Sequence, residues 1–400
     1  MTGTDGPTRG VPQEESAPKD HERERLYRDV ARLVEFDRRT ATVGEHRSAQ
    51  YIAGELVALG AADVATPTFR TQSSWAPAHL AHVAITAAAA AFPHRTARMV
   101  AALTAISYEL EVSGRSQWVR RLIPARRGTS VTARIPAGGR SYRTLILVAH
   151  HDAAHNGWVW QRSAVAASQW LSRRTGRAVP SHVPALSAMV AAAVPGRVPR
   201  LVAAGVLAGS AALMAQSMRS RTTPGANDNA SGVAAVLELA RRLIADPLPG
   251  TTVLVVLPGG EEVGNTGIRQ WLRHNRPQLD PETTLAINLD AVGSHGPLAV
   301  AYRESLSNPL SRQAVRRARE CAAELGIDIR TRAIPNPTDA VGLTHAGLTT
   351  VSLLSDEDGW ISHLHRSSDT IDQVDWRTVG HAVTLSHHIA AAWAAEGDRR

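Results

Sequence analysis

Five short segments of this chain carry side chains of the kinds that hold catalytic zinc. In chain order, these side chains are His150 with Asp152, Asp228, Glu261 with Glu262, Asp290 and His365. Imidazole nitrogens and carboxylate oxygens are ligands that Zn²⁺ takes readily, and a bridging carboxylate can join two ions roughly 3.5 to 4 Å apart. The set is large enough for two adjacent zinc ions, so the sequence predicts a metallohydrolase.

Apolar runs that are typical of strands precede three of these segments. The runs cover residues 145–149, 253–257 and 285–289. Nearly continuous apolar runs of this length indicate strands buried on both faces. Open α/β sheets place their sites at the carboxyl ends of such strands. We therefore expect ligands that are far apart in the sequence to meet at one edge of a central sheet.

The first run ends on His150, His151 and Asp152. Because side chains alternate along a strand, His150 and Asp152 are expected on one side and His151 on the other. His150 can then bind a metal while Asp152 orients its ring, which is the usual support for a ligating histidine. A lone histidine at a strand end is more often a packed or solvated side chain, so this segment gains weight only beside the others.

The next two segments supply carboxylates. Residues 224–232 form a loop that opens a helix expected from about 233 to 244, and helix capping alone would explain only one of the polar residues in this loop. Asp228 in this loop could bridge two metals. Glu261 and Glu262 follow a strand and lie between glycines. Buried neighbouring carboxylates repel each other unless positive charge is supplied, so one of the pair could bind metal while the other acts as a base.

The last two segments complete the set. Asp290 follows the third apolar run, and the segment with His363 and His365 lies ahead of a predicted helix cap at Asp369. Either histidine could serve as a zinc ligand on residue type alone. No single segment decides the function, but all five in this order indicate a metal centre.

These motifs together resemble the dizinc aminopeptidase-type metallopeptidase family, which includes aminopeptidase S, aminopeptidase Y, glutamate carboxypeptidase and the glutaminyl cyclases. The resemblance covers about residues 23–75 and 129–396. The matching residues are Ala149 to Asp152, Gly225 to Gly232, Gly260 to Gly264, Asn288 to Asp290, and His365 with Asp369 and Thr370.

The resemblance implies a three-layer α/β/α fold with a central mixed, mostly parallel sheet, and two Zn²⁺ per chain. One zinc would be held by His150, Asp228 and Asp290, and the other by Asp228, Glu262 and His365. Glu261 would be the general base, and Asp152 would support catalysis beside it. The implied activity is that of an exopeptidase, most specifically an aminopeptidase that hydrolyses the N-terminal bond of a peptide substrate.

The same resemblance bears on two further residues, His363 and Asp339. The family's spacing of the last ligand ahead of Asp-Thr favours His365 over His363. Asp339 resembles the family's Ser-Asp element ahead of the last strand, but Ala340 stands where a histidine often follows.

Two other functions remain as alternatives. One is a glutaminyl-cyclase-like acyltransferase with a single zinc, against which the retention of His150 and Asp290 argues. The other is a catalytically silent, membrane-associated binding protein of the same fold, which should have lost ligands or the base. A two-domain carboxypeptidase is disfavoured because only 27 residues separate Glu262 from Asp290, too few for its lid domain.

Composition fits a folded enzyme and argues against some partners. The chain has 400 residues, 44% of them apolar, which is enough for a full α/β core. Its single cysteine, Cys321, excludes an internal disulfide. The net charge of +8 could favour nucleic acid or anionic lipid. Because no basic motif interleaved with aromatics and no zinc finger is present, we expect a solvated basic surface and no nucleic acid partner.

The beginning of the chain is polar, charged and rich in Pro and Gly. Residues 1–22 lack the apolar core of a secretory signal, so we expect a disordered tail and no signal peptide. The predicted location is cytoplasmic or membrane-associated. Helices are expected at about 25–38 and 46–59.

Two Ala-rich insertions interrupt the peptidase pattern. We assign the zinc peptidase domain to residues 23–75, 129–157 and 223–396, the first apolar helical insertion to residues 76–128 and the second to residues 158–222. Proline-marked turns predict one helical hairpin in each insertion, with helices at about 80–92, 99–110, 183–194 and 201–218. The hairpins should leave the domain on the same side and shape access to the site.

The role of these hairpins is open at this stage. Only residues 201–218 approach the roughly 20 uncharged apolar residues that a bilayer span needs, and arginines flank the apolar segments. A membrane-associated bundle, a soluble four-helix subdomain and an oligomerisation surface all fit, and the oligomeric state is not predicted. For substrate specificity, we expect the irregular loops 295–303 and 356–360 to form pocket walls.

Overall fold

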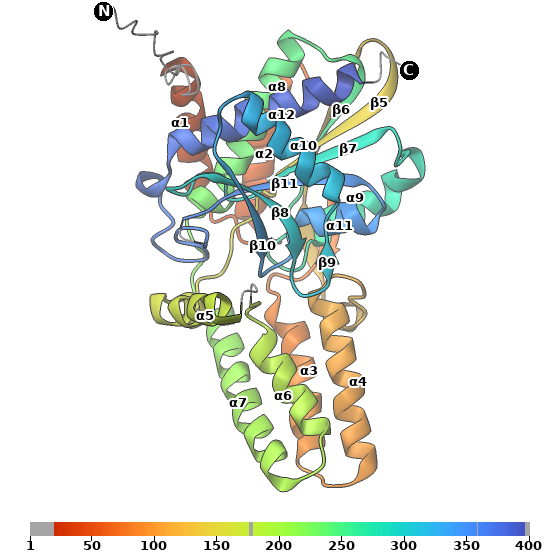
Figure 1. The fold of residues 1–400 in the computed structure, drawn as a ribbon, viewed down its shortest axis with the longest axis vertical. Helices are drawn as coiled ribbons and strands as arrows, with labels where there is room; N and C mark the ends of the chain where they lie inside the picture. The colour runs from red at the N-terminus through yellow and green to blue at the C-terminus, as the bar shows by residue number, and fades with distance from the viewer. Residues whose placement is uncertain (1–19, 176–178, 358, 397–400) are drawn as a thin grey trace, which may run out of the picture.

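The computed structural model describes residues 20–175, 179–357 and 359–396 of the 400-residue chain. They form an α/β domain from which a long helical bundle projects at one end (Figure 1). Of the predicted tail, residues 1–19 lie outside the described residues, and residues 20–22 begin α1 (Asp20–Val34). The first helix therefore starts and ends earlier than the sequence pattern indicates.

A nine-stranded mixed sheet forms the centre of the α/β domain. The strand order is β1-β4-β6-β5-β7-β11-β8-β10, with β9 paired to β8. The four neighbouring strands β6, β5, β7 and β11 are parallel to one another, and antiparallel pairs lie toward the edges. The strands are β1 (Ala62–Ala65), β4 (Val131–Ile135), β5 (Gly138–Val148), β6 (Pro249–Leu257), β7 (Thr284–Leu289), β8 (Leu298–Glu304), β9 (Asn308–Pro309), β10 (Ile329–Ile334) and β11 (Thr349–Ser355).

Helices cover both faces of this sheet, which confirms the predicted three-layer α/β/α class. Successive side chains of β5 enter opposite layers: Leu145 and Leu147 pack in one hydrophobic cluster, and Ile146 and Val148 in another. The first layer contains α1, α2 (Val43–Ala58), α8 (Gly232–Ala245), α10 (Arg312–Glu324) and α12 (Trp376–Ala395). The second contains α9 (Thr266–Asn275) and α11 (Asp339–His345).

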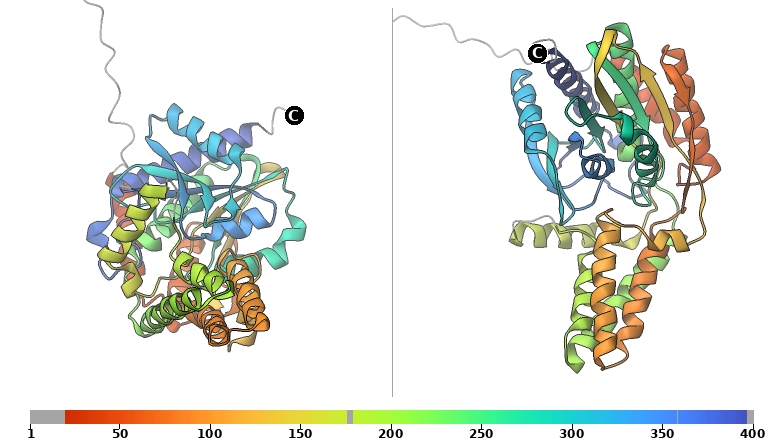
Figure 2. Two further views of the ribbon diagram at one scale, coloured as in Figure 1. Left: turned by 60° about the horizontal axis from the view of Figure 1, so that its bottom comes forward. Right: turned by 90° about the vertical axis from the view of Figure 1, so that its right-hand side faces the viewer.

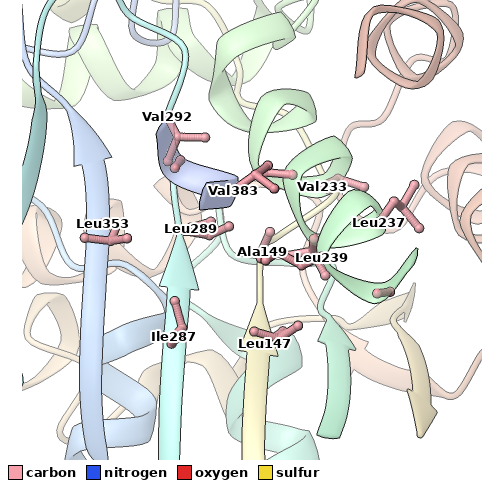
Figure 3. Close-up of a cluster of buried hydrophobic side chains, with 14 of the residues drawn as sticks. Leu147, Ala149, Val233, Leu237, Leu239, Ile287, Leu289, Val292, Leu353 and Val383 are labelled. Atoms are coloured by element: carbon pink, nitrogen blue, oxygen red, sulfur yellow. The ribbon is translucent and has the colours of Figure 1, made fainter. Parts of the chain in front are cut away.

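Large aliphatic side chains fill the first layer. Figure 3 shows Leu147, Leu289, Leu239 and Val383 converging from two strands, α8 and α12. All four are at most 1% exposed. Because each fully buried side chain of this size contributes roughly 1.5 to 3 kcal/mol, this layer holds the parallel strands, and therefore the ends of those strands, in fixed positions.

The bundle contains the two helical hairpins. One hairpin is α3 (Ala76–Ala90) with α4 (Arg95–Val112), and the other is α6 (Val183–Ala193) with α7 (Arg197–Arg219). The four helices pack against one another around a core of small residues, with Val83, Tyr108, Met189 and Leu207 among the larger buried side chains (Figures 1 and 2). Both hairpin turns lie at the end far from the sheet.

Further short elements join the bundle to the sheet. A helix without a predicted counterpart, α5 (Arg162–Thr175), lies across the junction, and none of its residues is buried (Figure 1). A second small sheet pairs β2 (Thr68–Thr71) with β3 (Arg126–Thr129). The remaining turns are η1 (Val119–Leu122), η2 (Trp158–Trp160), η3 (Ala226–Ser231), η4 (Arg276–Gln278) and η5 (Ile371–Gln373).

Candidate metal centre

The predicted ligands meet at the carboxyl edge of three adjacent parallel strands. His150 follows β5, Glu262 follows β6 and Asp290 follows β7 directly. Asp228 reaches the same edge from η3, at the start of α8, and His365 from the loop after β11. Sequence-distant side chains therefore meet because neighbouring parallel strands end at one edge of the sheet.

Asp228 lies between the two histidines. Its Oδ1 is 3.3 Å from His150 Nε2, and its Oδ2 is 3.1 Å from His365 Nε2. His150 Nε2 is also 3.9 Å from Asp290 Oδ2, and His365 Nε2 is 3.1 Å from Glu262 Oε2. His150, Glu261 and Glu262 form one possible group of three donors within 4.8 Å. Two further groups at the same distance are His150, Asp228 and Asp290, and Asp228, Glu262 and His365. These last two groups have Asp228 in common.

The charges of this cluster fit divalent cations. Burial raises the pKa of Glu262 to about 7 and that of Glu261 well above 4.5, and neighbouring carboxylates add to both shifts. Although burial opposes it, the carboxylate of Glu262 and the hydrogen bond to Asp228 raise the pKa of His365 to about 10. Within the described residues, buried Glu262 Oε1 has no hydrogen-bond partner. A cation between these donors would satisfy that oxygen and relieve the repulsion, and histidine with carboxylate is a zinc donor set.

Asp152 supports His150 from behind. Its Oδ1 is 3.4 Å from His150 Nδ1, and its Oδ2 accepts a 2.6 Å hydrogen bond from Thr40 Oγ1. The backbone N–H groups of Glu261 and Glu262 also donate to its two oxygens, at 3.1 and 3.3 Å. Asp152 therefore ties the histidine ring to the turn that carries the two glutamates.

His151 and His363 lie outside both donor groups. His151 points away from His150, with Nδ1 2.9 Å from Ser48 Oγ and Nε2 2.8 Å from the Thr129 carbonyl. Burial lowers its pKa to about 4. His363 Nδ1 is 2.7 Å from Ser368 Oγ. The structure thus brings His365, and not His363, to Asp228.

The loop that carries Asp228 is held by buried polar groups. Asp369 accepts hydrogen bonds from the backbone N–H groups of Asn227, at 2.8 Å, and Asp228, at 3.0 Å. The fully buried Arg38 donates to the carbonyls of Pro224 and Gly225, both at 2.7 Å. Arg38 was expected at the end of the first helix, which instead stops at residue 34. These contacts fix the bridging carboxylate.

Asn229, and not Asp228, bonds to the backbone at the start of α8. Its Oδ1 accepts from the N–H groups of Gly232 and Ala291, both at 3.1 Å, and its Nδ2 donates to the Leu289 carbonyl at 2.9 Å. The one polar residue of this loop that capping explains is therefore Asn229, which accepts from the N–H of Gly232 at the start of the helix. The carboxylate of Asp228 is left to face the histidines.

Glu261 and Asp339 are the remaining acids. Glu261 Oε1 accepts a 3.0 Å hydrogen bond from Asn265 Nδ2, and its Oε2 is 4.0 Å from His150 Nε2. Glu261 also lines the cavity above the cluster. Asp339 begins α11, is 1% exposed and belongs to neither donor group. Glu261 is thus the acid beside both groups that is not needed to complete either.

The cavity above the cluster has a volume of about 310 Å³ and lies between the α/β domain and the bundle. Side chains from α3, α4, α6 and α7 contribute to its wall. Among the described residues, the loops 295–303 and 356–360 contribute none of its lining. The sequence expectation that these loops form the pocket walls is therefore wrong.

The inserted segments also contact the loops of the metal cluster. Arg120 forms a buried ion pair with Glu111 of α4 and donates a hydrogen bond to the carbonyl of Val263, next to Glu262. The Trp160 ring meets the ring of His365 edge-on, with centroids 4.4 Å apart. Sequence patterns gave no sign of these contacts, since the partners are remote in the chain.

Comparisons with known proteins agree with this geometry. Residues 211–390 match Peptidase family M28, a stretch that contains Asp228, Glu261, Glu262, Asp290 and His365. A probable lipoprotein aminopeptidase of Mycobacterium tuberculosis is 26% identical over 185 residues, which cover 39% of this chain and 37% of that protein. The match thus spans little more than a third of the relative.

Solved structures share the fold over most of the chain. A glutaminyl cyclase of Bacteroides thetaiotaomicron is 14% identical, with a TM-score of 0.58 over 94% of this chain and 99% of that one. A zinc aminopeptidase of Bacillus subtilis is 14% identical, with a TM-score of 0.55 over 92% and 95%. A Zn-dependent exopeptidase of Parabacteroides distasonis is 14% identical, with a TM-score of 0.54 over 91% and 96%. At these identities the similarity concerns the fold.

Proposed function

We propose that this protein, residues 211–390 of which match Peptidase family M28, is a zinc-dependent aminopeptidase that releases N-terminal residues from peptides. One observation carries this proposal. Asp228 belongs to two donor groups at once, and Glu261 lies beside them as the acid that neither of these two groups uses. That arrangement supports two metals and one base.

The roles of the residues follow from their positions. His150, Asp228 and Asp290 would hold one zinc, and Asp228, Glu262 and His365 the other. The chemistry that zinc would supply at these residues is a lowered pKa for a water molecule and a polarised peptide carbonyl. Glu261 would take a proton from the attacking water and return it to the leaving amine.

Two further residues would position this machinery. Asn265 holds Glu261 through its 3.0 Å hydrogen bond. Asp152 contacts the back of His150 and the backbone of the glutamate turn, so we assign it a positioning role and not a direct part in proton transfer. Such supports commonly change metal affinity or activity by about 10- to 100-fold when they are removed.

The base is tested with a panel of aminoacyl 4-nitroanilides and the Glu261→Gln variant. The proposal predicts hydrolysis by the wild type and a loss of about 10²- to 10⁴-fold in kcat for the variant. Glu282→Gln, at an exposed position on the same domain, is the matched control. Equal rates for wild type and Glu261→Gln would remove Glu261 from the mechanism, and no hydrolysis by any form would remove the aminopeptidase function.

A glutaminyl-cyclase-like acyl transfer is the second candidate, because cyclases share the fold. Two complete donor groups favour the peptidase, since the cyclase needs only one zinc. Incubation with a peptide that begins with glutamine separates them by mass spectrometry. Loss of the residue indicates a peptidase, and loss of ammonia with the residue retained indicates a cyclase.

We also propose that the four-helix bundle inserts into a lipid bilayer. By length and composition, α7 is the one described helix that could cross a membrane, and most of its apolar stretch is exposed. At about 1.5 Å per residue, its 23 residues measure about 34 Å, against a hydrocarbon core of about 30 Å. Exposure of such an apolar helix to water is unfavourable, whereas contact with lipid chains is not.

The bundle exposes many large apolar side chains, whereas several polar side chains are buried within it. On α3, Ile85 points outward whereas His82 and Thr86 are buried, and on α4 Leu103 is exposed whereas Thr104 is buried. Soluble helices normally show the reverse pattern. The outward large apolar side chains of the four helices and their turns, apart from Leu213 in the cavity wall, are Ile85, Phe92, Met99, Val100, Leu103, Ile106, Val190, Val194, Val198, Leu201, Val202, Val206 and Met218.

Charge supports an anionic membrane as the partner. The insertions 76–128 and 158–222 contain 15 arginines and two acids, a net charge of +13, whereas the whole chain carries +8 and the rest therefore −5. Near the junction, Trp118, Trp158 and Trp170 are about half exposed. Arginines and tryptophans at the ends of an apolar bundle are typical of membrane interfaces.

Flotation with vesicles tests this proposal. The protein should float with phosphatidylcholine vesicles that contain 30% phosphatidylglycerol, and the doubly substituted Val202→Asp, Val206→Asp variant should bind at least about tenfold more weakly. Val57→Asp, at an equally exposed valine of α2, is the control. Wild-type protein that stays with the unbound fraction as a dimer would contradict insertion and support the oligomerisation interpretation.

A further inference from the structure

The cavity at the metal cluster has two unlike walls. Its floor contains the clustered ligands and Glu261, beside uncharged residues of the domain such as Ile334 and Leu364. Its roof comes from the inserted segments and is largely apolar or aromatic. Its apolar and aromatic residues include Tyr108, Val112, Ala185, Leu213 and Met214, and Trp75 lines the cavity from the position just before the first insertion. The floor suits a polar reacting group, and the roof suits an apolar one.

The charged groups of the roof lie beside opposite charges, although Glu111 Oε2 and His182 Nε2 have no hydrogen-bond partner among the described residues. Glu111 pairs with Arg120 inside the wall. His182 Nε2 lies 3.6 Å from Glu109 Oε2. Because ionic groups near the roof are matched within the protein, a charged substrate side chain would find no free counter-charge there. The roof therefore favours an uncharged, apolar group.

The roof is fixed relative to the floor. Arg120 links α4 to the Val263 carbonyl, and Gln117 Nε2 donates a 3.0 Å hydrogen bond to the Gly264 carbonyl. From the second insertion, Trp160 packs against His365. Both insertions thus hold loops that carry metal ligands. A preformed cavity of this kind binds without a large cost of ordering.

We infer that this roof chamber binds a long apolar chain on the acyl side of the scissile amide. The claim that this chain belongs to an amide that is hydrolysed rests on the proposed function. The claim that the chamber binds an apolar chain rests on the lining residues. The same chemistry occurs in two sources: a long apolar side chain on an N-terminal residue, or the fatty chain of an N-acyl amide.

Binding of n-alkyl hydroxamates to the zinc-loaded protein tests the chamber without turnover. Isothermal titration calorimetry in the bulky detergent digitonin would compare chains of two to ten carbons. Affinity should rise by up to about fourfold for each buried methylene. Ala185→Trp and Leu213→Trp, which fill the chamber, should cut the ratio of ten-carbon to two-carbon affinity at least about tenfold. Ala323→Trp, at an exposed alanine of α10, is the matched control.

The outcomes separate the chamber from the proposed function. An affinity that does not depend on chain length, or a ratio unchanged in both Trp variants, would overturn the inference even if peptides are hydrolysed. Length-dependent affinity without hydrolysis of any aminoacyl anilide would keep the chamber and overturn the aminopeptidase. Turnover of 2-aminodecanoyl anilide or of decanoyl anilide, which lacks the amine, would identify the source of the chain.

Discussion

In the α/β domain large aliphatic side chains point inward, whereas in the bundle many point outward. Outside the two insertions, the exposed large apolar residues in the described part of the chain are only Tyr27, Val43, Val57, Tyr142, Tyr302 and Leu306. The insertions carry all the others. The domain has a dense aliphatic core, and the bundle packs mainly on alanine. The two regions are therefore built for different surroundings.

This difference divides the work of the molecule. The domain supplies fixed strand ends, and these place ionisable ligands within a few ångströms of each other. The bundle supplies apolar surface on the outside and an apolar roof at the inner end. Substitutions in the domain should therefore change metal binding and the catalytic rate. Substitutions in the bundle should change membrane binding and substrate preference.

The largest expected effect is in the domain, at Asp228. Asp228→Asn weakens both donor groups at once, so kcat/KM should fall at least about a thousandfold, since metal polarisation contributes several kcal/mol. Zinc content, measured by mass spectrometry of the metal, should fall with it. Asp246→Asn, at an exposed position after α8, is the control. Full zinc content in Asp228→Asn would show that Asp228 does not bridge.

The junction between the regions should be next in size. Arg120→Met leaves the buried carboxylate of Glu111 unpaired, which should lower the free energy of unfolding by about 3 to 5 kcal/mol in denaturant titrations. The double variant with Glu111→Gln should recover part of this loss. If the single variant unfolds like the wild type, the bundle is not coupled to the glutamate loop through this pair.

A pH-dependent effect is expected beneath the site, at Glu304. Burial raises the pKa of this carboxyl to about 7, and it accepts hydrogen bonds from Thr338 and Ser352. The folded form therefore keeps its proton between about pH 4.5 and 7, where the unfolded chain loses it. Unfolding free energy of the metal-free protein should fall as pH rises through this window, by about 3 kcal/mol.

Above pH 7 this contribution should become constant. Glu304→Gln, which is neutral at every pH, should make the fall between pH 4.5 and 7 smaller by about 3 kcal/mol, while Glu262, whose pKa is also raised to about 7, continues to contribute. An unchanged slope in that variant would assign the dependence to another group.

The smallest effect is expected where the second insertion contacts a ligand. Trp160→Ala removes the edge-on contact with His365, a type of interaction that contributes about 0.5 to 1.5 kcal/mol. Zinc affinity, measured by competition with a chelator, should fall by up to about tenfold. Trp158→Ala, at the exposed neighbouring tryptophan, should leave it unchanged. Equal effects of the two changes would deny Trp160 a positioning role.

The strands of the α/β domain could be predicted from the sequence because each depends on a short, continuous run of apolar residues. Apolar runs form buried strands, and each run ends next to a ligand such as His150 or Asp290, so the edge of the sheet could be predicted. Asp369 and Asn229 were visible in the motifs, but their backbone bonds were not. Which amide or carboxylate fills a helix start depends on neighbours that only the fold brings together.

The bundle and the junction were less predictable. Helix α5 has no buried residue. Its sequence therefore has no apolar stripe from which the helix could be predicted. Trp160 contacts His365, and Arg38 contacts the loop at Gly225. These residues are far apart in the sequence, so only the folded structure shows the contacts. The pocket wall was expected from loops of the domain but comes from the insertions. Hairpins were visible in the sequence, whereas the direction of their polar side chains was not.

The most direct test of the central claim is the number of zinc ions per chain in the purified, fully loaded protein. Two complete donor groups with Asp228 in common predict about two zinc ions per chain, and loss of both activity and zinc on treatment with a chelator. One zinc per chain at saturation would contradict the dizinc site.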